Sequence, residues 1–176
     1  SVVAELGWRA HNTQTVELVP AVADVLKRAN LTAAALKGIA VALGPGSYTG
    51  LRIGLGAAKG LALANHTPIL GIPTLDIVAA SVSRSQISGQ LVTVIEAGRT
   101  RVSAAVYEWQ RNGWVAAADP SNYTWPELLD SVSELTTFVG EISVDGMKQI
   151  RSAKNCRMIS PAAAVRRPSF LAEMGW

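Results

Sequence analysis

The stretch between Gly44 and Gly60 constrains this 176-residue chain more than any other segment. Six of the fifteen glycines lie in it, at positions 44, 46, 50, 54, 56 and 60. The apolar run at residues 36–43 predicts a buried strand, and residues 48–64 predict a helix directly after the glycine turn. Each glycine inside a helix costs about 0.8–1.0 kcal/mol relative to alanine, so four of them need a compensating reason.

A bound phosphate would be one such reason, because a strand, a glycine turn and a helix N-terminus together form an anion site. The spacing of Gly44, Gly46 and Gly50 is one residue longer than the dinucleotide pattern, and the two residues after Gly50 are not those of a P-loop. Gly44, Gly46 and Ser47 are therefore cofactor-binding candidates on a near match. Ser47 lacks the spacing of a nucleophile elbow and is expected to cap the helix.

Close packing would be the other reason, because small side chains let another backbone approach a helix. Gly50, Gly54 and Ala58 recur every four residues and form one stripe, and Gly56 and Gly60 form a second. One stripe is expected to pack on the chain's own sheet. A second stripe on a different side of the helix predicts a protein partner.

The rest of the chain alternates helical and strand patterns, which predicts an α/β fold. Asn112-Gly113 predicts a hairpin, and Thr124 with Glu127 has the spacing of a capping box. The polar stretch 81–90 is expected to link an N-terminal lobe, residues 1–85, to a C-terminal α/β lobe, residues 86–176. The expected strands are 1–6, 36–43, 69–72, 91–95, 102–109, 114–118, 137–139 and 156–159, and the expected helices are 11–30, 48–64, 74–83, 124–135, 145–155 and 168–174.

Residue types that usually carry chemistry are scarce. One cysteine, Cys156, and two separated histidines, His11 and His66, predict neither a disulfide nor a metal site. No apolar run reaches the roughly 20 residues that span a bilayer. No secretory signal is visible, and residues before Ser1 are expected to be missing. We therefore expect a cytoplasmic protein without a membrane partner, a catalytic residue or a metal of its own.

The charge is uneven although the net value is only +3. Residues 148–176 hold six basic residues and one acidic residue, so this segment is +5 and residues 1–147 are −2. Lys148, Arg151, Lys154 and Arg157 recur every three residues and would form a basic strip on a helix. Such a strip is either a solvated face or a contact for tRNA phosphates, and no aromatic residue within it suggests base stacking.

The glycine-rich stretch resembles the signature of the TsaB (YeaZ) family. The resemblance rests on GPGSYTGLRIG at residues 44–54, AKGLA at 58–62, ILGI at 69–72 and TLD at 74–76, and it is strong over residues 11–80. Two features depart from the family. The family's first strand, which ends in an aspartate-threonine turn, is absent, and Glu96 to Arg99 matches an Asp-Ala-Arg stretch only in part.

The resemblance implies a two-lobed fold related to actin, sugar kinases and the Hsp70 ATPase. It also implies a non-catalytic partner of TsaD in the synthesis of threonylcarbamoyladenosine beside the tRNA anticodon, with ATP and a metal on TsaD. The family dimerises through its first two helices, here 11–30 and 48–64, and a homodimer is expected when the chain is alone. The implied partner-interface residues are Leu18, Val22, Val25, Gly50, Leu51, Gly54, Leu55 and Ala58.

Two other functions fit the same residues. A nucleotide-binding enzyme would use the turn from Gly44 to Gly50. A self-associating module would pair the same helices isologously, without a TsaD-like partner.

Overall fold

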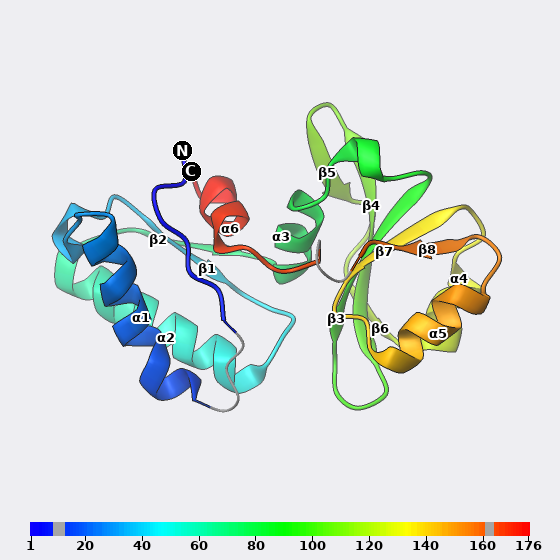
Figure 1. The fold of residues 1–176 in the computed structure, drawn as a ribbon, viewed down its shortest axis with the longest axis horizontal. Helices are drawn as coiled ribbons and strands as arrows, with labels where there is room; N and C mark the ends of the chain where they lie inside the picture. The colour runs from blue at the N-terminus through cyan, green and yellow to red at the C-terminus, as the bar shows by residue number, and fades with distance from the viewer. Residues whose placement is uncertain (9–12, 161–163) are drawn as a thin grey trace. The chain divides into compact units, whose positions relative to one another are not determined.

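The computed structural model describes residues 1–8, 13–160 and 164–176. Its contacts divide the chain into two compact units, one made of Ser1–Pro73 with Arg167–Trp176 and the other of Thr74–Arg166. Each unit has its own β-sheet (Figure 1). This division differs from the one expected at residue 85, because the helix that begins at Thr74 packs on the sheet of the second unit.

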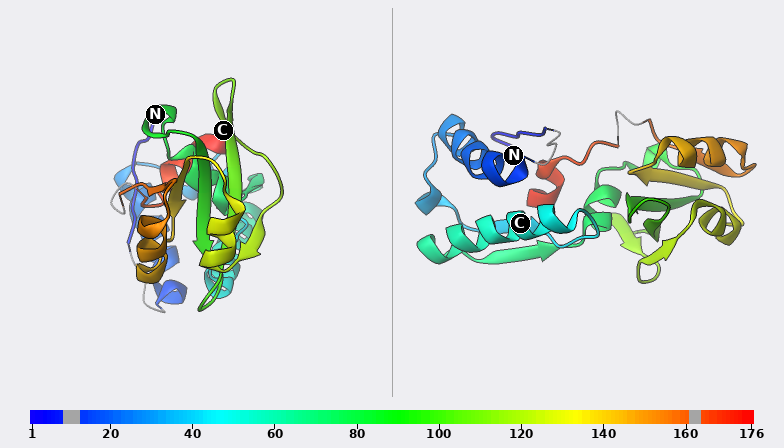
Figure 2. Two further views of the ribbon diagram at one scale, coloured as in Figure 1. Left: turned by 90° about the vertical axis from the view of Figure 1, so that its right-hand side faces the viewer. Right: turned by 90° about the horizontal axis from the view of Figure 1, so that it is seen from below.

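In its described residues, the first unit has a parallel pair of strands, β1 (Ile39–Ala42) and β2 (Ile69–Ile72). α2 (Tyr48–Asn65) packs along this pair, and α1 (Gln14–Arg28) lies next to α2 (Figure 2). α6 (Pro168–Met174) packs against β1, and a short 3-10 turn spans Ala33–Ala35. The helices and strands predicted between residues 14 and 72 and at 168–174 are thus confirmed, with shorter bounds for α1 and β1.

The helix predicted from residue 11 begins at Gln14, and His11 lies outside the described residues. Pro20 lies inside α1. The hydroxyl of Ser47 accepts a hydrogen bond from the Gly50 backbone N–H at 3.2 Å, so the predicted N-cap of α2 is confirmed.

The first eight residues form no strand, so the strand predicted at residues 1–6 is wrong. A strand needs a hydrogen-bonded neighbour, and in the described residues β1 pairs with β2 alone. Glu5 holds the segment instead. Its carboxylate accepts two hydrogen bonds from Arg167, at 2.6 and 3.1 Å, and one each from the backbone N–H and hydroxyl of Ser169, at 3.1 and 3.0 Å.

The second unit is built on a mixed sheet in the order β5-β4-β3-β7-β8, with β6 beside β4. β3 and β4 are antiparallel, and β3 is parallel to β7, which is parallel to β8. The strands are β3 (Gln90–Glu96), β4 (Val102–Gln110), β5 (Gly113–Ala116), β6 (Ser121–Tyr123), β7 (Thr136–Gly140) and β8 (Cys156–Met158). β6 was not predicted, because its three residues carry no apolar alternation.

Helices cover both faces of this sheet. α3 (Thr74–Ala80) packs on one face, in a core with Leu91, Tyr107 and Val139. α4 (Trp125–Ser131) and α5 (Val144–Ser152) contribute to the core on the other face. The predicted capping box is confirmed, since Thr124 and Glu127 exchange hydrogen bonds at the start of α4.

The polar stretch 81–90 is part of the second unit, so its interpretation as a linker between lobes is wrong. Val82 and Ile87 are buried in the same core as α3, and a 3-10 turn, Arg84–Gln86, lies between them. Two apolar side chains among polar ones were enough to anchor a segment whose average composition resembles a linker.

A hydrogen bond between the buried Tyr107 and the half-buried Asp76 ties α3 to the sheet. The hydroxyl of Tyr107 donates to the carboxylate of Asp76 at 2.5 Å. Burial raises the pKa of Tyr107, and the hydrogen bond to Asp76 raises it further, so the phenol stays protonated and remains a donor.

We expect the attachment of the N-terminal segment through Glu5 to weaken at acid pH, because it depends on an ionised carboxylate. The hydrogen bond from Arg167, followed by those from Ser169, holds the pKa of Glu5 below its ordinary value of about 4.3. Stability from this carboxylate is therefore fully present above about pH 4.3 and is lost as the pH falls through the lower folded pKa. Urea unfolding at a series of pH values should show a shallower acid decline for Glu5→Gln than for the natural chain. Equal declines would contradict this role.

Gly146 predicts a steric limit in α5. A Cβ added there would lie 2.3 Å from a ring atom of Trp125, which is buried. Overpacking costs about 1–3 kcal/mol, and alanine recovers at most about 1 kcal/mol of helix propensity. Gly146→Ala should therefore lower the free energy of unfolding by about 1–2 kcal/mol in urea titrations. An unchanged midpoint would show that the Trp125 ring moves freely.

Candidate functional site

The outward side of α2 is the most unusual surface of the first unit. We define the α2 outer face as the exposed residues of this helix, which are Tyr48, Thr49, Arg52, Gly56, Lys59, Gly60, Leu63 and Ala64. Leu63 is 78% exposed and Tyr48 is 73% exposed, so two large side chains flank the two glycines. Single exposed apolar residues are common, but here they share one helix face with bare backbone.

The two glycines of this face have no explanation within the chain. A Cβ added at Gly56 or Gly60 would meet nothing within 4 Å, and neither glycine has the positive φ that would require the residue type. Each nevertheless costs about 0.8–1.0 kcal/mol relative to alanine. The second small-residue stripe predicted from the sequence therefore lies on an open face, where close approach by another chain would account for it.

The first stripe is buried only at Ala58, since Gly54 is half-buried and a Cβ added there would meet nothing within 4 Å. Ala58 is only 6% exposed and is buried within the first unit, so we leave it out of the α2 outer face. The other predicted interface residues of α2 are half-buried, and their role in an interface stays a prediction: Gly50, Leu51, Gly54 and Leu55.

On α1 the predicted residues Leu18, Val22 and Val25 are half-buried and also remain predictions. Val16 and Val19 are 71% and 60% exposed, and the sequence analysis missed them. Their spacing of three residues is typical of one apolar side of a helix. Two residues are a weaker signal than the longer apolar stripe that contains Leu18, Val22 and Val25.

Charge on the α2 outer face is of one sign. The side chain of Arg52 lies over the ring of Tyr48, with its guanidinium carbon 5.4 Å from the ring centroid, and one nitrogen donates to the Tyr48 hydroxyl at 3.3 Å. Lys59 is also exposed, and α2 contains no acidic residue. A complementary partner surface would be apolar with acidic residues at its edge.

The glycine turn before α2 shows one defined role. Ser47 caps the helix, while Gly44 has a φ of +109°, a conformation that favours glycine. Turn geometry thus accounts for Gly44 and capping for Ser47. Nucleotide binding at Gly44, Gly46 and Ser47 stays a prediction.

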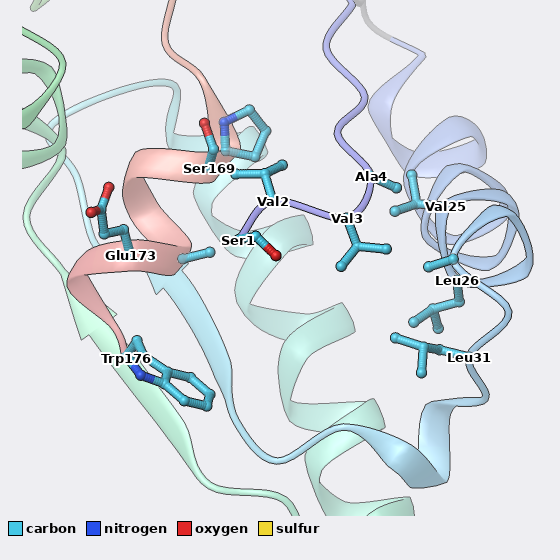
Figure 3. A pocket seen from close by; sticks show the side chains of 13 residues that line it. Ser1, Val2, Val3, Ala4, Val25, Leu26, Leu31, Ser169, Glu173 and Trp176 are labelled. Atoms are coloured by element: carbon cyan, nitrogen blue, oxygen red, sulfur yellow. The ribbon is translucent and has the colours of Figure 1, made fainter.

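A largely apolar groove of about 720 Å³ lies elsewhere in the first unit (Figure 3). Val2 and Val3 of the N-terminal segment, Leu26 of α1 and Trp176 after α6 lie around it. Its chemistry is that of a packing surface, because most of its lining residues are apolar and its polar side chains are few, among them Ser1, Ser169 and Glu173.

Among the residues that the structure describes, the remaining reactive residue types lie apart from one another. His66 ends α2 in the left-handed conformation, and burial raises the pKa of the half-buried Cys156 thiol. Within residues 1–8, 13–160 and 164–176, no three or more His, Cys, Asp and Glu side chains are grouped to hold a metal ion. In the same described part, every helix is too short or too polar to cross a membrane.

The expected basic strip does not form on one helix, because α5 ends at Ser152. Lys148 and Arg151 lie on α5, and Lys154 follows it. Arg157 lies in β8 between two residues that pack with the α4–α5 core, so its side chain points to the opposite face of the sheet. All four side chains are exposed.

Comparison with known structures defines the class of fold first. YeaZ from Pseudomonas aeruginosa matches with a TM-score of 0.74 at 22% identity, over 96% of this chain and 79% of that one. The fold is therefore the actin-like α/β fold that was expected. The family model described as TsaD, tRNA N6-adenosine threonylcarbamoyltransferase, matches residues 2–160.

The chain belongs to this family, and within it to the TsaB (YeaZ) group. The tRNA threonylcarbamoyladenosine biosynthesis protein TsaB of Escherichia coli is 34% identical over 125 residues, which are 71% of this chain and 53% of that protein. TsaB of Bacillus subtilis is 29% identical over 181 residues, 99% of this chain and 78% of that protein. The chain thus spans about half the length of the Escherichia coli relative.

Replacing Gly60 by alanine should stabilise the isolated chain. The added methyl meets open space, so the gain in helix propensity of about 0.8–1.0 kcal/mol is unopposed. Urea titration of Gly60→Ala should show a higher midpoint, and Gly56→Ala should behave alike. A lower midpoint would mean that the stripe packs inside the unit.

Proposed function

We propose that this chain is the non-catalytic TsaB-type subunit of a complex that makes threonylcarbamoyladenosine in tRNA, in the cytoplasm. Its role is to bind a TsaD-like catalytic subunit, which holds the ATP, the metal and the chemistry. The tRNA is reached through the complex. The names of the relatives support the pathway, and the α2 outer face supports a role in binding another protein.

The single observation that carries this proposal is the pair of unexplained glycines on the α2 outer face. Glycine lowers helix stability, and this loss is compensated where the backbone of another chain packs closely against the helix. Leu63 and Tyr48 on the same face, with Val16 and Val19 on the neighbouring α1, supply apolar area, and burying each is worth about 1.5–3 kcal/mol. That total is of the size needed to offset the entropy lost on association.

Self-association through the same face is the main competitor. A two-fold axis would place the glycines of one copy against those of another, which the geometry of a helix allows. Arg52 and Lys59 oppose this pairing, because two copies would bring like charges together, whereas an acidic partner would neutralise them. A homodimer of the chain alone is thus a weaker state that the TsaD-like partner displaces.

The test is complex formation with a TsaD-like protein. Gly60→Leu fills the space that the partner needs and should weaken binding at least tenfold, while Gly60→Ala should weaken it less. Gly38→Leu is the matched control, since a Cβ at Gly38 also meets open space but lies outside α2. Affinity is measured by calorimetry, and folding by circular dichroism.

If the Gly60→Leu variant binds the TsaD-like protein with the affinity of the natural chain, the α2 outer face is not the interface. Light scattering of the chain alone and of the mixture separates the homodimer from the heterodimer. Calorimetry with ATP and ADP on the chain alone addresses the alternative of a nucleotide-binding enzyme, which requires binding together with hydrolysis.

A further inference from the structure

The β4–β5 hairpin of the second unit (Figure 1) carries two tryptophans that are partners across the two strands. Trp109 and Trp114 are paired in register, with ring centroids 5.2 Å apart and planes at 82°. The guanidinium of Arg84 lies over Trp114 at 6.0 Å from its centroid. Arg111 lies in the turn that joins the strands, with a φ of +51°. We call Arg84, Trp109, Arg111 and Trp114 the hairpin patch.

Core packing accounts for only part of this patch. Trp114 is half-buried, packs on the α3 core and donates its indole N–H to the carbonyl of Val82 at 2.8 Å. Trp109 stands two pairs nearer the turn than Tyr107 and is 39% exposed. Trp109 lies on the end of β4 that extends beyond its pairing with β3, and this end pairs with β5 alone. Its ring packs on that of Trp114, but core packing does not account for the exposed part of the indole.

The patch is fixed in place before any ligand arrives. Arg84 donates from one guanidinium nitrogen to the carbonyl of Ile87 at 2.6 Å, which holds the guanidinium plane near Trp114. Trp114 is held by Val82, and Trp109 is held against Trp114. A ligand that stacks here loses little side-chain entropy in the protein, which favours affinity.

The charge of this surface is positive. Alternation along β4 places Trp109 on the same side as the buried Tyr107, and places Glu108 on the opposite side. Arg84 and Arg111 are thus the charged residues of the hairpin patch, and both are exposed. Open aromatic faces beside arginines suit unpaired nucleotides, whose bases stack and whose phosphates are anionic.

We propose that the hairpin patch binds unpaired nucleotides of an RNA loop, with a base stacked on Trp109 and phosphates near Arg84 and Arg111. The choice of RNA rests on the proposed function, because the relatives act in tRNA modification. The α5 residues Lys148 and Arg151 lie on a helix without an exposed aromatic ring, so they offer charge without stacking. The hairpin patch offers positive charge and an exposed aromatic ring together.

The experiment measures binding of a fluorescein-labelled RNA hairpin with an unpaired loop, by anisotropy, to the chain alone and to its complex with the TsaD-like protein. A continuous RNA duplex of equal length is the reference ligand. Stacking of one base is worth about 1–3 kcal/mol, so Trp109→Ala should weaken loop binding about tenfold. Trp109→Phe keeps a ring and should stay within about threefold of the natural chain.

Two further variants make the result specific. Trp176→Ala removes a fully exposed tryptophan from the first unit and should leave RNA affinity unchanged. Arg111→Ala should lower the slope of log affinity against log salt by about 0.7, since it removes one phosphate contact. Because Arg111 lies in an exposed turn, this variant keeps the test decisive even if Trp109→Ala fails to fold.

The proposal is overturned if Trp109→Ala binds the loop as tightly as the natural chain, or if the duplex binds as tightly as the loop. It is also overturned if Trp109→Ala releases the TsaD-like protein without changing RNA affinity, which would make the patch a protein interface. RNA binding by the chain alone that depends on Trp109, without any association with the TsaD-like protein, would refute the proposed function and support the patch.

Discussion

Small residues on α2 determine how closely this helix approaches whatever lies on either side of it. On the inner side, Ala58 is buried within the first unit, where a larger side chain would displace the helix. On the outer side, Gly56 and Gly60 leave the backbone bare toward open space. Van der Waals attraction is appreciable only between atoms in contact. The bare backbone at Gly56 and Gly60 therefore contributes no packing energy until a second surface contacts it. The first unit thus depends on α2 twice, once for its own core and once for the proposed interface.

Much of the fold was predictable because its elements have strong local signals. α2 begins after a serine cap, α4 begins at a reciprocal Thr124–Glu127 capping box, and α6 begins at Pro168. The β4–β5 hairpin was predicted at Asn112-Gly113, although the turn residues are Arg111 and Asn112 because Gln110 pairs with Gly113. Where local chemistry fixes an end, the sequence and the structure agree to within a few residues.

The failures concern properties that arise only between distant segments. The N-terminal segment alternates like a strand, but pairing requires a free neighbour, and Glu5 binds Arg167 and Ser169 from the far end of the chain instead. The stretch 81–90 looks like a linker because composition averages over Val82 and Ile87, which are the residues that anchor it. The hairpin patch could not be seen either, since Arg84 meets Trp114 only through the packing of the 3-10 turn on the sheet.

The same limit explains why the candidate interface was only partly predicted. Helical periodicity shows which residues share a side of α2 but not which side faces the strands. Ala58 was therefore grouped with Gly50 and Gly54 although it is buried within the first unit, whereas a Cβ added at Gly54, Gly56 or Gly60 would meet open space. The α2 outer face and the hairpin patch belong to different units and differ in chemistry: the first is smooth and apolar with basic residues, and the second is aromatic with arginines. A subunit that joins a protein to an RNA needs two such surfaces, because a single face cannot be complementary both to an apolar helix and to a stacked base.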